Sequence, residues 1–191
     1  MKEFLQSYQT SLAECLATIR PAEFEKHIDL IAEAYRNNKQ IFVCGNGGSA
    51  AAANHFVCDF GKNAVKDPAK RRFRILSLSD NVERITAYGN DVAFEEIFSQ
   101  QLINLMNPGD LLIVISASGK SPNIVAACRY ARSHGAKVIS LSGFAGGEIK
   151  ALSDVCLIAP LTSYEQIEDV QLILLHMTTC FIKENQQLLQ P

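Results

Sequence analysis

GDLLIVISASGKS, residues 109–121, is the stretch that decides the fold. Residues 111–115 are all apolar, which is typical of a strand buried on both faces. A serine-rich turn follows, and Pro122 suits the first position of a helix because the N–H that proline lacks has no helical partner there. A buried strand that turns directly into a helix favours an α/β protein with a parallel sheet.

Four further short apolar runs alternate with helical patterns. They are Gln40–Cys44, Phe73–Leu78, Lys137–Leu141 and Val155–Ile158. Strand–helix alternation gives right-handed crossovers, so we expect a three-layer α/β sandwich with a flavodoxin-like, five-stranded parallel sheet flanked by helices. Helical periodicity predicts two helices within residues 1–37 and a long helix from about Tyr164 to Leu188. Because no repeat or linker divides the chain, we expect one domain over residues 1–191.

The composition excludes several classes of protein. Of 191 residues, 48% are hydrophobic and 20% are charged, which is typical of a folded chain and not of a disordered one. Eighteen basic residues against 20 acidic ones give a net charge of −2, without the basic excess of a nucleic-acid-binding protein. The apolar runs are too short to span a membrane, and the first residues begin an amphipathic pattern unlike a signal peptide. We therefore expect a cytoplasmic protein without nucleic-acid or membrane partners.

The six cysteines lie mostly inside apolar runs, and none forms a C-x-x-C pair. This pattern predicts reduced cysteines buried in the core, since metal-binding or redox cysteines usually come in close pairs. Cys44 directly precedes a glycine-rich turn, so we expect it beneath a bound ligand, contributing only bulk.

The serine turn, residues 116–121, is a candidate phosphate site. Ser116, Ser118 and Ser121 supply hydroxyls, and the helix that begins at Pro122 supplies free amides and the positive end of its dipole. Gly-Lys-Ser resembles the end of a Walker A motif, but the first glycine of that motif would fall at Val114 inside the strand, which argues against a nucleotide loop. The alternative is an ordinary turn with capping serines, although three serines and a glycine exceed what capping requires.

The glycine turn, residues 45–50, fits G-x-G-x-x-A, the pattern of dinucleotide-binding proteins. The acidic residue expected about 20 positions later is missing, because the nearest candidate, Asp80, lies too far along. We therefore expect close backbone approach to a small ligand, with polar contacts from Asn46 and Ser49. A tight turn with a serine cap is the alternative. Residues 143–147, GFAGG, form a third glycine-rich turn at the same edge of the sheet.

His55 and Asp59 are four residues apart and therefore share one helix face, which suits two ligands of one metal or an acid–base pair. His176 is an isolated polar residue in the apolar C-terminal helix. Each histidine alone also fits a structural role. Asn90 and Asp91 can bind sugar hydroxyls or form an Asx turn. The basic segment 62–74 is either a solvated loop or a surface that attracts an anionic substrate.

These segments resemble the sugar isomerase (SIS) domain family and, within it, the phosphoheptose isomerases. The resemblance spans nearly the whole chain, and it rests on CGNGGSA at 44–50, HF at 55–56, GND at 89–91, GDLLIVISASGKS at 109–121, LSG at 141–143 and LLH at 174–176. It implies interconversion of sedoheptulose 7-phosphate and D-glycero-D-manno-heptose 7-phosphate. It also implies a homotetramer in which the N-terminal segment 1–37 contacts neighbouring subunits, with active sites near the interfaces.

The resemblance also implies roles for individual residues. Sugar-phosphate contacts fall on Asn46, Gly47, Gly48, Ser49, Asn90, Asp91, Ser116, Ala117, Ser118, Ser121 and Glu168. The residues implied to bind zinc or another divalent metal are His55, Asp59, Glu168 and His176. Asp59 and His176 are also implied to be the catalytic acid–base residues. The chain departs from the family pattern at three positions: Asp59 replaces a usual Glu, Glu168 a usual Gln and Ala117 a common Thr.

Two other functions compete with this one. A branch of the same superfamily associates with the bacterial replication initiator and lacks a full catalytic set, whereas both histidines and an acidic residue 59 are present here. Isomerisation of a different phosphosugar would keep the site and change only the substrate.

The spacing between Glu168 and His176 constrains the metal site. The two residues are eight positions apart, which is about 12 Å along an unbroken helix and too far for one ion to bind both. Either the helix is irregular near residue 168, or the ligands come from neighbouring protomers, or Glu168 contacts substrate and not the metal. We favour a site shared between subunits.

Overall fold

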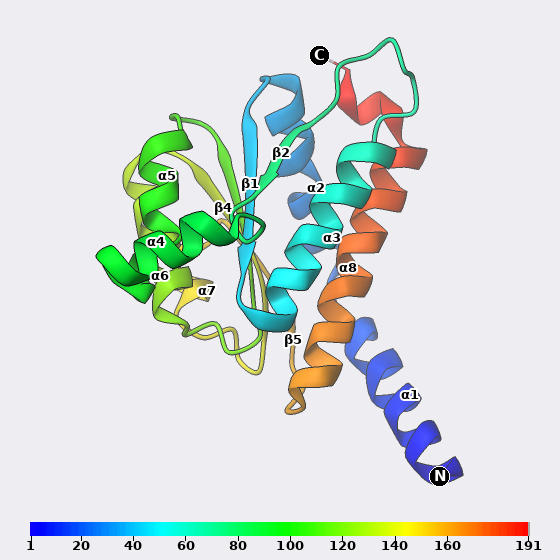
Figure 1. Cartoon of the computed structure of the whole chain (residues 1–191). Coiled ribbons are helices and arrows are strands. Elements are labelled where there is room, and N and C mark those ends of the chain that lie inside the picture. The colour runs from blue at the N-terminus through cyan, green and yellow to red at the C-terminus, as the bar shows by residue number, and fades with distance from the viewer. Residues whose placement is uncertain (191) are drawn as a thin grey trace.

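The computed structural model describes residues 1–190 and contains one five-stranded sheet (Figure 1). Every neighbouring pair of strands is parallel, and the strand order is β2-β1-β3-β4-β5. The strands are β1 (Gln40–Gly45), β2 (Arg74–Ser77), β3 (Leu111–Ser116), β4 (Lys137–Gly143) and β5 (Val155–Ala159). This order is that of flavodoxin-like sheets, which confirms the predicted fold class.

Alternate residues of each central strand enter different cores, which explains the continuous apolar runs. In β3, Ile113 belongs to one apolar cluster, whereas Leu112 and Val114 belong to another on the opposite face. The first cluster is covered by α2, α3 and α8, and the second by α5, α6 and α7 (Figure 1). A strand covered on both faces has no solvent side, so every position selects an apolar residue.

The helices are α1 (Lys2–Ala17), α2 (Pro21–Arg36), α3 (Gly47–Asn63), α4 (Val82–Asp91), α5 (Ser99–Leu105), α6 (Pro122–Ser133), α7 (Ile149–Leu152) and α8 (Tyr164–Glu184). Two short 3-10 helices are η1 (Phe94–Glu96) and η2 (Gln186–Leu189). The predicted end of the C-terminal helix at Leu188 is therefore wrong, since α8 stops at Glu184 and the chain continues as a 3-10 turn. Across residues 1–190, no helix is both long and apolar enough to cross a membrane.

Helix α1 extends away from the sheet, and its N-terminus lies far from the other layers (Figure 1). Met1, Phe4 and Leu5 are exposed on it. The Tyr8 hydroxyl donates a hydrogen bond to the Asp169 carboxylate of α8 at 2.6 Å, and this bond raises the pKa of Tyr8 to about 12. The helix is thus joined to the start of α8, close in sequence to Glu168.

The basic segment between α3 and β2 uses several of its cations structurally. Arg71 donates to the Tyr35 and Arg36 carbonyls at the end of α2, where cations interact favourably with the helix dipole. Arg72 donates to the Val65 carbonyl, and Arg74 donates to that of Asn38. Arg71 and Arg74 therefore join this region to the end of α2 and the residues that follow it, whereas Arg72 closes a contact within the segment itself.

The prediction that all six cysteines are buried is only partly right. Cys15, Cys44 and Cys128 are buried and Cys156 is half-buried, but Cys58 and Cys180 are exposed. The apolar runs that contain these two form helices, and a helix turns some residues of any run outward.

Candidate functional site

A pocket of about 150 Å³ lies at the carboxyl edge of the sheet, between the turns that follow β1 and β3. This is the position at which parallel sheets of this order bind ligands, because the strand connections diverge there. Its lining is Asn46, Ser49, Ile115, Ser116, Ala117, Ser118, Ser121, Tyr164 and Glu168. Seven of these nine residues were predicted from the sequence as site residues, and Ile115 and Tyr164 were not.

Backbone amides of the serine turn form hydrogen bonds to its own serine side chains. Gly119 has a φ of +62°, and its amide donates to the Ser116 hydroxyl oxygen at 3.2 Å. The Lys120 amide donates to the Ser118 hydroxyl oxygen at 3.2 Å. These two bonds orient the hydroxyl groups of Ser116 and Ser118 at the pocket, and each hydroxyl keeps a hydrogen to donate to an anion.

Ser121 occupies the N-cap position of α6, but within residues 1–190 its side chain makes no capping bond. Ser121 is thus the N-cap residue by position and through its main-chain oxygen, without a bond from its side chain. Pro122 has no N–H, and the amides of Ile124 and Val125 both donate to the main-chain oxygen of Ser121. The Ser121 hydroxyl is left for the pocket, which it lines.

The third glycine-rich turn supports the serine turn from behind. The Ile149 amide donates to the Gly119 carbonyl at 3.1 Å, and the Gly143 amide donates to the Ala117 carbonyl at 2.8 Å. A side chain on Gly147 would lie 2.5 Å from the Gly119 backbone, so the two turns touch main chain to main chain. The GFAGG turn thus fixes the shape of the phosphate-binding candidate.

The glycine turn brings Glu168 into the pocket. Glycine at position 48 leaves room for the carboxylate of Glu168, which any larger side chain there would strike. This carboxylate lies beside the first turn of α3, whose amides favour a negative charge. Helix α8 is unbroken from Tyr164 to Glu184, which removes the irregular helix from the three explanations for the spacing of Glu168 and His176.

Cys44 is a fully buried residue of β1, next to Gly45 at the start of this turn. Burial, together with the nearby Cys128, raises the pKa of the Cys44 thiol well above its usual value. The thiol therefore stays protonated and fills space under the turn, as expected from the sequence.

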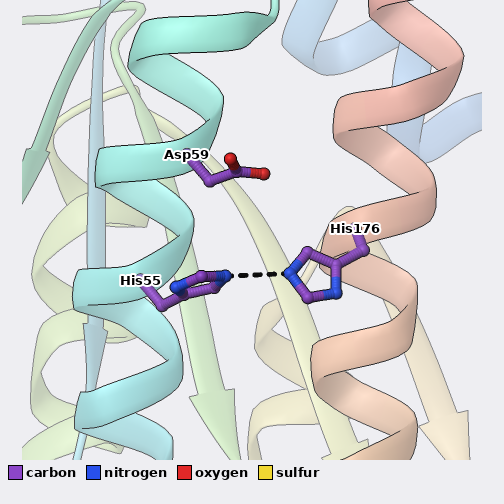
Figure 2. A group of neighbouring side chains, drawn as sticks. All are labelled: His55, Asp59 and His176. Carbon is purple, nitrogen blue, oxygen red and sulfur yellow. Dashed lines mark hydrogen bonds between the residues drawn. The ribbon is translucent and has the colours of Figure 1, made fainter.

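His55, Asp59 and His176 form a second group, on the adjoining faces of α3 and α8 (Figure 2). The Nε2 atoms of the two histidines are 2.9 Å apart, and one ligand atom from each of the three residues lies within 4.8 Å of the others. The Asn63 amide donates to Asp59 Oδ1 at 2.5 Å, which orients the carboxylate. Both histidines are exposed and Asp59 is half-buried, so the group is open to solvent or to a neighbouring surface.

This group fits a divalent metal. Two nitrogens and one carboxylate oxygen are a usual donor set for catalytic zinc, which keeps one further position open. Two nitrogens bound to tetrahedral zinc lie about 3.3 Å apart for bonds of about 2.0–2.1 Å, so the observed separation of 2.9 Å needs only a small adjustment. Glu168 is outside the group and lines the pocket, two helical turns away on α8.

Asn90 and Asp91 lie apart from both groups. They form the exposed end of α4, where the Asn90 amide donates to the Asp91 carboxylate at 2.7 Å. Their contact with sugar hydroxyls stays a prediction. Because neither residue lines the pocket of its own chain, this contact would have to be made to a sugar in the pocket of another chain.

Together, a flavodoxin-like sheet, a serine turn and a glycine turn around one pocket define the SIS class of sugar-phosphate proteins. A model of the SIS domain family matches residues 3–143. A phosphoheptose isomerase from Aliarcobacter butzleri is 34% identical over 186 residues, which cover 97% of this chain and 96% of that relative.

Two solved structures agree with the sequence comparison. A phosphoheptose isomerase from Neisseria gonorrhoeae superposes with a TM-score of 0.86 at 28% identity, over 96% of each chain. One from Francisella tularensis gives a TM-score of 0.84 at 27% identity, also over 96% of each. The chain belongs to the SIS domain family, in its phosphoheptose isomerase branch.

Proposed function

We propose that the protein is a cytoplasmic isomerase that interconverts sedoheptulose 7-phosphate and D-glycero-D-manno-heptose 7-phosphate. The observation that carries the proposal is the pocket, in which three serine hydroxyls surround the start of a helix and Glu168 faces them from α8. Two relatives that align with 97% and 92% of this chain are named phosphoheptose isomerases, which supports the choice of substrate. The phosphate binds at the serine turn, and the sugar extends toward the glycine turn.

The reaction moves one proton between two adjacent carbons. A base removes a proton from C1 of the ketose, and an acid protonates the carbonyl oxygen on C2 as the enediolate forms. A proton is then delivered to C2 while the hydroxyl oxygen on C1 gives up its proton, which yields the aldose. Asp59 and His176 take these roles. An imidazole ring can both accept and donate a proton, and the Asp59 carboxylate, oriented by Asn63, is the second proton carrier.

His55, Asp59 and His176 are the residues that would hold a zinc ion, and Glu168 is a further ligand only if the site combines two protomers. When bound, the ion would stabilise negative charge on the enediolate oxygens. Glu168 also accepts hydrogen bonds from sugar hydroxyls in the pocket.

The pocket and the histidine group are separated along α3 and α8 within one chain, which supports a site shared between protomers of a tetramer. Gly48 and His55 are seven residues apart on α3, or about 10 Å along the helix, and Glu168 and His176 are about 12 Å apart on α8. A neighbouring protomer that places its histidine group over this pocket would bring both to one sugar. The exposed apolar residues of α1 offer a surface for such an assembly.

Mixing two inactive variants tests the shared site. Glu168→Ala and His176→Ala chains, unfolded together and refolded into mixed tetramers, should regain part of the activity because some interfaces pair one intact residue from each parent. The same variants refolded separately are the control. Mixed tetramers, confirmed by native mass spectrometry, that stay inactive would place the site within one chain.

Purified protein incubated with sedoheptulose 7-phosphate, with and without added zinc, tests the activity itself. We expect the aldoheptose phosphate to appear and zinc to increase its rate. Turnover of another phosphosugar alone would keep the mechanism and change the substrate. No turnover of any phosphosugar, together with binding to the replication initiator, would favour the non-enzymatic branch of the superfamily.

A further inference from the structure

The side chain of Asn46, which lines the pocket, is bonded to a residue that the sequence did not single out. Asn46 Nδ2 donates to Asn123 Oδ1 at 2.8 Å, and Asn123 Nδ2 donates back to Asn46 Oδ1 at 2.9 Å. Asn123 is 2% exposed, in the first turn of α6 directly behind the serine turn. This closed pair of hydrogen bonds links the two turns that form the pocket.

The pair also changes what Asn46 does for its own helix. Asn46 is the N-cap residue of α3, and an asparagine there usually accepts a hydrogen bond from the second or third amide of the helix. Within residues 1–190, the Asn46 side chain makes no such cap, because both of its polar atoms are bonded to Asn123. The first amides of α3 therefore receive no side-chain cap from Asn46, and the Glu168 carboxylate lies next to Gly48 in that turn.

We propose that Asn123 is a positioning residue for substrate binding, which keeps the Asn46 side chain off the first turn of α3. Without Asn123, the Asn46 side chain is free to rotate onto its own helix and to cap the amides that would otherwise face a ligand. Such a cap stabilises α3 while it closes part of the pocket. With Asn123 present, Asn46 keeps one N–H and one lone pair for a sugar hydroxyl.

The proposal predicts that substrate binding weakens while stability stays nearly unchanged, a combination that a purely structural role does not produce. Asn123→Leu keeps the size of the side chain and removes both hydrogen bonds. We expect the Kd for sedoheptulose 7-phosphate, measured by calorimetry on the zinc-loaded protein, to rise about tenfold, as for the loss of one good hydrogen bond. The melting temperature should stay within about 3 °C of the parent, because the cap gained by α3 offsets the lost pair.

Gln101→Leu is the matched control. Gln101 is 1% exposed, and its amide donates to the Leu78 and Ile97 carbonyls away from the pocket lining. Its replacement should lower the melting temperature and leave the Kd unchanged. An Asn123→Leu variant that behaves in the same way would overturn the proposal.

Two further variants sharpen the test, and the second of them, Asn123→Asp, replaces Asn123→Leu if that variant fails to fold. In an Asn46→Gly background no side chain can cap α3, so Asn123→Leu should add less than twofold to the Kd, and a full tenfold addition would contradict the proposal. Asn123→Asp introduces a carboxyl group in place of the Asn123 amide. Only the protonated carboxyl group can both donate to and accept from the Asn46 side chain, as the amide does. Its Kd relative to the parent should approach one at low pH and rise with pH, since burial and the Glu168 carboxylate across the pocket favour the neutral form. A ratio that does not change with pH would also contradict the proposal.

The inference rests on the proposed function only for the choice of ligand. A parent protein that binds sedoheptulose 7-phosphate without converting it would refute the proposed activity, and the Kd comparison would still decide the role of Asn123. Inorganic phosphate serves as a second probe of the same pocket. Parent protein that binds neither probe would overturn both proposals.

Discussion

The pocket at the sheet edge and the histidine group on α3 and α8 are built in different ways. The pocket is shaped by main chain, through the contacts of Gly119 with the GFAGG turn and the hydrogen bonds of the serine turn. The histidine group consists of three side chains on two helix faces, of which two are exposed. The pocket is therefore preformed for binding, whereas the histidine group is completed by what binds to it. Changes in the pocket should mainly alter KM, and changes in the histidine group should mainly alter kcat.

The largest effect is expected in the histidine group. His176→Ala and Asp59→Asn should each lower kcat by about 10²–10⁴-fold, the usual contribution of a positioned acid or base. Both should also lose zinc, measured by elemental analysis, while KM changes little. His134→Ala, at an exposed histidine on the far end of α6, is the control. Full activity in either variant would refute the assigned roles.

The next effect concerns the contact between α2 and α8, where His27 of α2 is fully buried and its Nε2 lies 2.9 Å from the Thr178 hydroxyl oxygen. Burial lowers the pKa of His27 to about 4. In the unfolded chain His27 takes up a proton near pH 6.5, whereas in the folded chain it stays neutral down to about pH 4. The free energy of unfolding is therefore highest above pH 6.5 and falls as the pH drops toward 4. The loss attributable to His27 is roughly 3 kcal/mol.

Urea unfolding at pH 7 and pH 4.5 measures this effect. His27→Leu should flatten the fall in unfolding free energy between the two values, because no proton is taken up at that position on unfolding. His134→Ala again serves as the control and should keep the parent's dependence. An unchanged fall in His27→Leu would show that other groups cause the acid sensitivity.

A smaller effect is expected in the pocket. Ser121→Ala should raise KM about 10- to 100-fold, as for loss of a hydrogen bond to a charged phosphate, with kcat nearly unchanged. Because the Ser121 hydroxyl does not cap α6, the melting temperature should move by no more than about 2 °C. Ser133→Ala, at the other end of the same helix, is the matched control. An unchanged KM in a folded Ser121→Ala protein would remove the phosphate from this turn.

The smallest effect belongs to the contact between α1 and α8. Tyr8→Phe removes the exposed hydrogen bond to Asp169, and exposed polar contacts contribute little to stability. The melting temperature should fall by about 2 °C or less, which differential scanning calorimetry resolves. A larger fall would show that α1 is part of the cooperative core, and not a projecting helix fixed by few contacts.

The sheet was predictable because its central strands are buried on both faces, so that neighbouring residues such as Leu112 and Ile113 are both apolar. The serine and glycine turns were predictable for a related reason, since parallel strands place all their carboxyl ends at one edge. The pairing of His55 with Asp59 followed from helical spacing alone. These features depend on local sequence or on a single topological rule.

Other features depend on contacts between distant segments and left no local signal. Nothing near Asn123 indicates that its amide meets Asn46, 77 residues away. The GFAGG turn has the composition of a ligand-binding loop, yet its last glycine, Gly147, is needed for close contact with Gly119. The exposed Cys58 shows the same limit, because an apolar helical run does not reveal which of its faces is buried.

Proton NMR of the zinc-loaded protein with sedoheptulose 7-phosphate in D₂O tests the central claim most directly, because it follows both the product and the transferred proton. If an acid–base pair works through an enediolate, the aldoheptose 7-phosphate should form with deuterium at C2, and the remaining ketose should acquire deuterium at C1. A folded protein that forms no aldoheptose phosphate would contradict the proposed activity. Because both histidines of this group are exposed, the proton held by the base should exchange with solvent, and product that carries only protium at C2 would contradict an acid–base pair open to solvent.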